Sequence, residues 1–507
     1  REVLRKLSGR SSLHGLEPSQ VVLGILTRPK LWEKIPIVRV KAKQLKETLG
    51  ITGAQKLSTY RSFFDGQGKY KLSEAVDLAS AKVPFERNEI EKEILKLDER
   101  VAIFLMVQKG TLLKIFPLPE DFMKRWFGFR KIWDHLDEDK SSKLEIASRS
   151  FIDEVFARRY EKARTHLESI KKFQVDYGSD VFPDMSKVEM ELLYHRLGIF
   201  PKLSLLYLGL GLVVLVMSFW EAIRQQSIGV AVKRSVQVLS AIMLTAHGFG
   251  LGLRAYVSGH MPLSDTYESL VTISFFCLLA GLILTWRSIF VTSSSLLMSG
   301  IFLFVAHLNS IDPEITNLVP VLKSFWLSVH VSVITSSYGF FGIACFLGAG
   351  TLTLLALPLK KAPTRQVKML TDLNEAYIII GLTLLVIGNF LGAIWANESW
   401  GRYWGWDPKE TWAYISIITY VLVLHLRMLK KLYSEYLQAS CSTLAFSTIL
   451  MTYFGVNFYL SGKHSYATGD PILIPVWAYV MMGVVFCLIF LAGIGHRRHA
   501  ARERASD

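Results

Sequence analysis

Cysteine is scarce in this 507-residue chain, and its distribution excludes two common kinds of site. The four cysteines, Cys277, Cys345, Cys441 and Cys487, all fall in apolar segments. Such a pattern indicates neither a disulfide framework nor a zinc site. The first 195 residues also lack a nucleophile motif, a metal-binding cluster and a Gly-rich phosphate loop. The features that point to function must therefore lie in the rest of the chain.

Charge is also limited, because charged residues make up 20% of the chain and most of them precede residue 195, whereas 51% of all residues are hydrophobic. A net charge of +15 can indicate a nucleic-acid partner. No basic patch interleaved with aromatic residues accompanies it, so we expect no nucleic acid. Many Lys and Arg residues instead flank apolar runs, where they orient membrane helices. We therefore expect membrane lipids around much of the chain.

Residues 1–195 are expected to form a mainly helical soluble domain. In the ranges 72–109 and 145–173, apolar residues recur at three-and-four spacing among charged ones, which is typical of amphipathic helices. Prolines at 117, 119 and 183 separate these patterns. The sequence opens at Arg1 without an apolar targeting segment, and we expect it to continue a longer product.

From Leu203 onward, about nine apolar stretches are each long enough for a spanning helix of about 20 residues. We expect these spans at 203–222, 236–257, 266–286, 289–308, 327–357, 374–396, 409–429, 439–460 and 473–494. The predicted fold class is therefore all-α. It consists of a polytopic membrane helix bundle over residues 196–507, preceded by a helical soluble domain.

The basic residues between the spans predict the orientation in the membrane. In an alternating assignment, five basic clusters lie on one side, which the positive-inside rule makes cytoplasmic. The clusters are Lys233 with Arg234, Arg287, Lys360 and Lys361 with Arg365, Arg427 with Lys430 and Lys431, and Arg497 with Arg498. The external side then contains the soluble domain, the loops 259–268 and 461–471, the start of the fifth span and the tryptophan-rich segment 400–410. We expect a multi-pass protein of the cell (inner) membrane.

The sharpest motif is the segment Trp400–Glu410, with the sequence WGRYWGWDPKE, between two apolar runs. Its last four residues have the composition of a helix N-cap with a capping box. Its first seven residues offer more flat aromatic surface than one helix end requires. The aromatic residues are Trp400, Tyr403, Trp404 and Trp406. The alternative explanation is an interfacial aromatic belt, which is common beside spanning helices.

The segment Trp400–Glu410 resembles the tryptophan-rich WWD motif of haem-handling proteins in cytochrome c maturation, and the flanking sequence is most similar to CcsA. Residues 2–9 resemble the external domain of fused CcsBA proteins, so residues 1–195 correspond to the CcsB-like end and residues 196–507 to CcsA. The resemblance implies that haem b is exported and presented outside for thioether attachment to the Cys-x-x-Cys-His of apocytochrome c. Such a protein forms part of a holocytochrome c synthase. The implied haem contacts in the motif are Trp400, Tyr403, Trp404, Trp406 and Asp407.

Two histidines belong to the same predicted external face as the tryptophans. His330 lies at the outer start of the fifth span, and His464 lies in the outer loop after the eighth. A haem iron bound by two imidazoles needs one on each side of the macrocycle, and the porphyrin needs flat apolar partners. In CcsA proteins, the histidines before and after the WWD segment are the axial ligands, which implies this role for His330 and His464. The alternative is that each is an interfacial polar residue.

His425 lies within the seventh span, about 16 residues and so roughly 24 Å from its outer start. An ionisable residue inside a span is a functional hypothesis. The alternative is a side chain that extends to the inner surface beside Arg427. The resemblance implies that His425 ligates a transmembrane haem and that the upstream CcsB portion supplies the partner ligand. His247 is an internal alternative, and it is equally compatible with a structural or gating role.

The loop at residues 260–268, HMPLSDTYE, matches a CcsA segment and implies Tyr267 and Glu268 as haem contacts. Ser264 or Asp265 can cap the third span. Arg254, near the outer end of the second span, can pair with Asp265, with Asp407 or with a haem propionate, and the sequence leaves these open.

Two other functions compete with the synthase. A haem transporter or chaperone would deliver haem to a separate ligase, as the relatives CcmC and CcmF divide the task. A membrane electron-transfer protein would need two pairs of histidine ligands aligned across the bilayer. The sequence shows one pair and one further histidine, and it has no Cys-x-x-Cys-His of its own.

Overall fold

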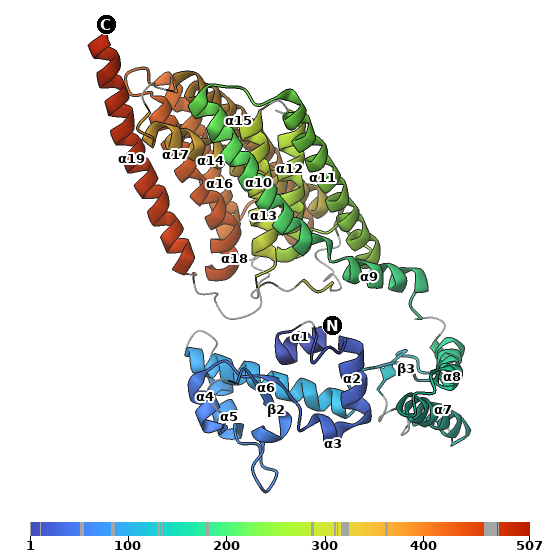
Figure 1. Cartoon of the computed structure of the whole chain (residues 1–507). Coiled ribbons are helices and arrows are strands. Elements are labelled where there is room, and N and C mark those ends of the chain that lie inside the picture. The colour runs from blue at the N-terminus through green and yellow to red at the C-terminus, as the bar shows by residue number, and fades with distance from the viewer. Residues whose placement is uncertain are drawn as a thin grey trace. The chain divides into compact units, whose positions relative to one another are not determined.

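The computed structural model divides into two compact units, Arg1–Asp184 and Met185–Asp507 (Figure 1). It describes the chain except for residues 1, 11, 51–54, 83–86, 129–131, 133–134, 137, 179–181, 285–287, 309–310, 312, 316–323, 360–362, 461–473, 475 and 507. The second unit begins with α9 (Met185–Leu197), which the sequence analysis assigned mostly to the first domain. α9 packs against α11 (Val230–Ser258), and the Ser186 and Tyr256 hydroxyls lie 3.0 Å apart.

The first unit is mainly helical, with two small antiparallel sheets. Its elements are α1 (Glu2–Ser8), α2 (Pro18–Thr27), α3 (Pro29–Trp32), β1 (Pro36–Arg39), α4 (Lys43–Thr48), β2 (Leu57–Thr59), η1 (Tyr60–Phe63), α5 (Ser73–Ala81), α6 (Glu89–Gln108), β3 (Phe116–Pro117), β4 (Trp126–Phe127), α7 (Glu138–Phe156) and α8 (Tyr160–Gly178). β1 pairs with β2, with Val38 opposite Ser58, and β3 pairs with β4, with Phe116 opposite Phe127. One apolar core joins α1, α2, β1 and α6, and a smaller one lies under α7 and α8.

The second unit is a helix bundle. Its elements after α9 are α10 (Ile199–Arg224), α11 (Val230–Ser258), α12 (Thr266–Leu284), α13 (Ile289–Ala306), α14 (Phe325–Ala356), α15 (Thr364–Trp400), α16 (Pro408–His425), η6 (Leu426–Met428), α17 (Glu435–Leu450), η7 (Met451–Gly455), α18 (Val456–Tyr459) and α19 (Val476–Ser506). Eight helices within the described residues are long and apolar enough to cross a membrane. The all-α fold class and the polytopic bundle are therefore confirmed.

The predicted span at 439–460 is the one that does not appear as a single long α-helix. It consists of α17, the π-helical segment η7 and the short α18 in direct succession. A π-helical segment interrupts the α-helical hydrogen-bond pattern, and such segments are frequent at functional sites. Within the described residues, eight of the predicted spans are therefore uninterrupted helices, and the span at 439–460 is interrupted.

Small and hydroxylated residues allow the helices to pack closely where no water can satisfy polar groups. α13 is largely buried, although it contains three consecutive serines. The hydroxyls of Ser293 and Ser294 donate to Phe290 O, and that of Ser295 donates to Val291 O, each over 2.8 Å. These polar side chains are therefore satisfied within their own helix, which makes α13 suitable for the centre of the bundle.

Candidate functional site

The tryptophan motif forms the tight connection between α15 and α16. Gly401 ends α15 in a left-handed conformation, with φ at 69°. Asp407 caps α16 by accepting a hydrogen bond from Lys409 N over 3.1 Å. The Glu410 carboxylate accepts from Gly405 N at 2.8 Å and pairs with Arg402 at 2.9 Å. The sequence-predicted capping box is therefore formed, and it holds the aromatic residues in one loop conformation.

The four aromatic residues of the motif fall into two groups. Tyr403 and Trp404 line a cavity at the end of the bundle. Trp406 is 70% exposed and lies edge-on to Trp404, with ring centroids 5.7 Å apart. Trp400 packs against the buried Trp395, with ring centroids 4.7 Å apart, and the Arg402 guanidinium lies over the Trp400 ring. Only Tyr403 and Trp404 of the four thus line the cavity.

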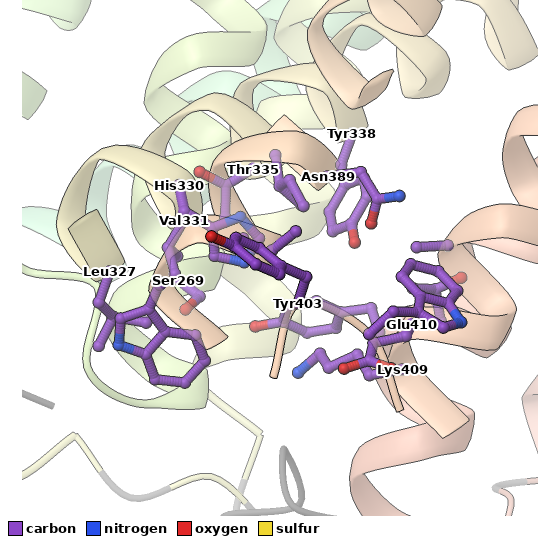
Figure 2. A pocket seen from close by; sticks show the side chains of 18 residues that line it. Ser269, Leu327, His330, Val331, Thr335, Tyr338, Asn389, Tyr403, Lys409 and Glu410 are labelled. Atoms are coloured by element: carbon purple, nitrogen blue, oxygen red, sulfur yellow. The ribbon is translucent and has the colours of Figure 1, made fainter. Parts of the chain in front are cut away.

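The cavity lies between α12, α14, α15, α16 and η7, and Figure 2 shows the side chains around it. Its lining is largely apolar and aromatic, with a few polar groups, as is usual in small-molecule sites. The lining residues are Ser269, Leu327, His330, Val331, Ile334, Thr335, Tyr338, Asn389, Gly392, Ala393, Trp395, Tyr403, Trp404, Lys409, Glu410, Ala413, Thr452 and Tyr453. The structure therefore places His330 and the aromatic motif around one cavity.

His330 projects into this cavity from α14 in a defined orientation. Its Nδ1 lies 2.7 Å from the Gly388 carbonyl oxygen of α15. Because a carbonyl can only accept, Nδ1 carries the proton and Nε2 carries the lone pair of the neutral ring. Histidines that bind metals commonly donate their second nitrogen to a backbone carbonyl in this way. The ring is also parallel to Trp395, at 6.4 Å between centroids. His330 thus has the orientation and tautomer of a metal ligand.

Two glycines of α15 make this arrangement possible. A Cβ atom at Gly392 would lie 2.4 Å from Cε1 of His330, and one at Gly388 would lie 2.5 Å from Cγ1 of Ile334. The sequence interpretation did not predict a role at this site for Gly388, Gly392 or Trp395. The Gly-x-x-x-Gly spacing within an apolar run was the available signal, because it is typical of close helix packing in membranes.

Tyr267 and Glu268, which the family resemblance implies as haem contacts, form a buried cluster with Arg254, for which a haem propionate is one of three predicted partners. Arg254 Nε donates to Glu268 Oε1 over 2.7 Å, and the guanidinium also donates to the Tyr194 hydroxyl and to the Pro313 and Glu314 carbonyl oxygens. The same guanidinium lies 4.9 Å from the Tyr267 ring centre. Of the three pairings left open for Arg254, the structure forms the one with Asp265, at 3.7 Å, and adds the shorter one with Glu268.

Asp265, one of the two predicted caps, forms the cap of α12 by accepting from Glu268 N over 2.7 Å. Burial and the neighbouring Glu268 carboxylate raise the pKa of Asp265 to about 6. His307, which follows α13, lies 3.5 Å from the Tyr267 hydroxyl, and burial lowers the pKa of its imidazole. The cluster adjoins the cavity, because the Tyr453 hydroxyl of η7 donates to Thr266 O over 3.0 Å and Ser269 lines the cavity wall.

The remaining histidines occupy different settings. His425 is the last residue of α16, is exposed, and has Nδ1 2.7 Å from Val421 O. His247 is fully buried, with its two ring nitrogens 3.1 Å from the Tyr207 hydroxyl and 3.1 Å from Val271 O. Two internal hydrogen bonds suit a structural role for His247. His464 lies outside the described residues.

Comparison with known proteins assigns the central part of the second unit to one family. A family model described as cytochrome C assembly protein matches residues 263–464, which include every residue that lines the cavity. The chain is 50% identical to protein NrfI of Wolinella succinogenes over 474 residues. The aligned region covers 93% of this chain and 52% of NrfI. The chain therefore spans about half the length of NrfI.

The chain also resembles shorter proteins over most of their length. It is 34% identical to the cytochrome c biogenesis protein CcsA of Guillardia theta over 242 residues, 43% of this chain and 80% of that protein. It is 32% identical to CcsA of Synechococcus sp. strain CC9311 over 300 residues, 52% of this chain and 96% of that protein. On the strength of these matches, the chain belongs to the CcsA family of cytochrome c biogenesis proteins.

Proposed function

We propose that this protein acts in cytochrome c maturation by exporting haem b and presenting it, at the cavity beside the tryptophan motif, for covalent attachment to apocytochrome c. Together with an upstream CcsB portion it forms a holocytochrome c synthase. The family supports the role in cytochrome c maturation. The observation that carries the finer proposal is that His330, with its proton held on Nδ1, faces the same cavity as Tyr403 and Trp404.

The lining of the cavity suits a haem, which is the cargo of the proposed reaction. A porphyrin offers two flat apolar faces, and Tyr403, Trp404 and Trp395 offer aromatic surface around the cavity. The iron needs a nitrogen lone pair, which Nε2 of His330 supplies. His464 is proposed as the second axial ligand. Trp400, Trp406 and Asp407 support the loop in this proposal, and Arg254, Tyr267 and Glu268 brace the adjoining helix start.

The proposed route begins at His425, at the other end of α16, where haem enters from the cytoplasm. Haem then moves outward through the bundle and docks with His330 and His464 on the iron. At the cavity, each cysteine thiol of the apocytochrome adds across one vinyl group. Sulfur bonds to one vinyl carbon and hydrogen to the other, so no electrons are gained or lost. The apocytochrome histidine then replaces one of the two protein ligands on the iron.

The basic clusters support an orientation in which this chemistry takes place outside the cell membrane. His425 is followed by Arg427, which pairs with Asp372 and Glu375 at the same end of the bundle. That end is cytoplasmic in the proposed orientation, and the tryptophan motif lies at the external, periplasmic end of α16.

Co-expression with an apocytochrome tests the proposal. The full-length protein, with its upstream portion, is expressed beside an apocytochrome c in a host that lacks its own maturation system. We expect the cytochrome to acquire covalent haem, measured by haem staining after denaturing electrophoresis. If the purified protein carries haem but the cytochrome never acquires it, the ligase activity is wrong and delivery to a separate ligase takes its place.

Absorption spectra of purified variants test the assignment of ligands. We expect His330→Gly and His464→Gly to perturb one and the same haem, and His425→Gly to perturb another. If His330→Gly left every haem band unchanged, the proposed external site would be wrong.

A further inference from the structure

Lys409 brings a positive charge to a cavity that is otherwise mainly apolar and aromatic. It is the second residue of α16, and it lines the cavity together with His330 and Tyr403 (Figure 2). Its Nζ donates to Asn457 Oδ1 of α18 over 3.0 Å. This partner is a neutral amide, which satisfies one of the three ammonium hydrogens and none of the charge.

The other charged side chains around the cavity are compensated within the protein. Glu410 pairs with Arg402 and accepts two backbone hydrogen bonds, from Gly405 and Asp407. Arg254, in the adjoining cluster, pairs with Glu268. Among the residues that the structure describes, no carboxylate oxygen lies within 4.0 Å of Lys409 Nζ. The Asp407 carboxylate, which caps the backbone of α16, attracts the Lys409 ammonium group electrostatically but does not form an ion pair with it within 4.0 Å.

A charge at an apolar cavity is costly unless an opposite charge accompanies it. A ligand that brings a carboxylate to this point would gain a charge-assisted hydrogen bond at a site of low dielectric constant. The same ligand must present a flat apolar face to the aromatic residues and a metal to His330. The lining is therefore complementary to a metalloporphyrin that carries carboxylate side chains.

We infer that Lys409 binds a propionate carboxylate of the haem in this cavity, and so fixes the rotation of the macrocycle about the bond between the iron and His330. The inference rests on the proposed function and deepens it. An axial ligand and a flat aromatic wall leave a porphyrin free to rotate in its own plane. The propionates of haem b lie on one edge and the vinyl groups on the other side of the ring. Anchoring the propionate edge at Lys409 therefore places the vinyl groups away from α16, where incoming thiols must meet them.

Lys409 also has a purely structural explanation, because its bond to Asn457 links α16 to α18. Asn457→Ala removes this link and leaves the ammonium in place, which makes it the matched control. Lys409→Gln removes the charge and keeps a side chain that can hydrogen-bond to Asn457. Lys409→Arg keeps the charge, although in a wider and planar group.

The experiment titrates the purified full-length protein and these variants with haem b and with haem b dimethyl ester, following the absorption bands. The ester keeps the ring, the iron and the vinyl groups but lacks the carboxylates. We expect the wild type to bind the free acid roughly 10- to 100-fold more tightly than the ester, the usual size of a hydrogen bond to a charged group. Lys409→Gln should bind both forms equally, at the level of the wild type with the ester. Asn457→Ala and Lys409→Arg should keep most of the preference.

Equal binding of acid and ester by the wild type would overturn the role of Lys409 without touching the proposed function, since haem would still bind. The role of Lys409 would also be overturned if Asn457→Ala abolished the preference for the free acid as completely as Lys409→Gln. The hydrogen bond between α16 and α18 would then explain the loss of that preference. Failure of the wild type to bind either form would instead overturn the proposed function, and the inference with it. The comparison of acid with ester in the wild type needs no variant, so a variant that fails to fold does not prevent the test.

Discussion

The Arg254 cluster and the His330 cavity are neighbouring polar regions of one helix bundle, but they differ in how their polar groups are satisfied. In the cluster, the Arg254 guanidinium pairs with Glu268 and donates hydrogen bonds to two backbone carbonyl oxygens and to a hydroxyl group. At the cavity, His330 and Lys409 line a mainly apolar space, and each makes a hydrogen bond to a neutral group, the Gly388 carbonyl and the Asn457 side-chain amide respectively. The charge of the cluster is thus balanced within the protein itself, whereas the polar groups at the cavity are suited to bind a ligand.

The difference teaches that a buried polar residue in a membrane span does not identify its own role. An ionisable group inside a bundle is costly in either case, and it is retained because it is paired or because it binds something. The two cases make opposite predictions. Changes in the cluster should lower stability, whereas loss of a ligand-binding side chain at the cavity should lower haem binding and leave stability nearly unchanged.

The largest effect is expected from Glu268→Ala, which leaves the Arg254 charge buried without its closest partner. Breaking a buried ion pair costs about 3–5 kcal/mol of folding free energy. We expect thermal unfolding of the purified protein in detergent to shift accordingly, and Glu268→Gln, which can still accept a hydrogen bond, to shift less. If Glu268→Ala unfolds like the wild type but has lost haem, the cluster is part of the haem site and does not serve stability alone.

His330→Gly should have the opposite profile. Removal of the imidazole should lower the yield of covalent cytochrome c by roughly a hundredfold, at least as much as the loss of a residue that only orients a metal ligand. The unfolding temperature should stay close to that of the wild type, because His330 is only partly buried. Added imidazole should enter the space left by the side chain and restore part of the haem signal. A large loss of stability without imidazole rescue would assign His330 a structural role.

Gly392→Ala tests the wall behind His330. A methyl group here would collide with a ring that Gly388 O already holds, so the imidazole must tilt or α14 must move. Overpacking of this kind costs about 1–3 kcal/mol, and we expect haem binding to weaken by about tenfold. Gly252→Ala is the matched control, because nothing lies within 4 Å of a Cβ at that position in α11. Equal binding by the two variants would show that the position of His330 is not decisive.

The fold was predictable because membrane spans depend on length and apolar composition, which one sequence contains. The expected span at 266–286 corresponds to α12 (Thr266–Leu284), and that at 289–308 to α13 (Ile289–Ala306). The interruption of the span at 439–460 was not predictable, since η7 has the composition of an ordinary apolar helix. Its π-helical turn brings Thr452 and Tyr453 to the cavity wall. Such a turn depends on packing between helices, which composition does not record.

The candidate site was predictable where local motifs carry it and not where distant helices meet. Asp407 and Glu410 form the capping box that their spacing predicts. By contrast, the contact between His330 and Gly388 joins residues 58 positions apart, and Lys409 meets Asn457 across 48. From the sequence, Lys409 is predicted only to lie at the start of a helix. Its position at the cavity follows from the tertiary arrangement of α14, α15 and α16.

The smallest expected effect is a pH dependence of stability that belongs to the cluster and not to the cavity. Asp265 has a pKa raised from its ordinary value of 3.8 to about 6, by burial and by Glu268. Its protonated form is therefore favoured by folding, and this contribution is complete below about pH 4 and is lost as the pH rises through about 6.

Unfolding of the wild type should accordingly show a decline in stability between pH 5 and pH 7 of about 1 kcal/mol or less, because a third of the side chain is exposed. Asp265→Asn keeps a good N-cap for α12 and removes the titrating group, so this variant should lose that decline. Haem binding should show no matching change over the same range. If Asp265→Asn instead altered the pH dependence of haem binding, protonation in the Arg254 cluster would be coupled to the cavity through the start of α12. The two regions would then act as one site.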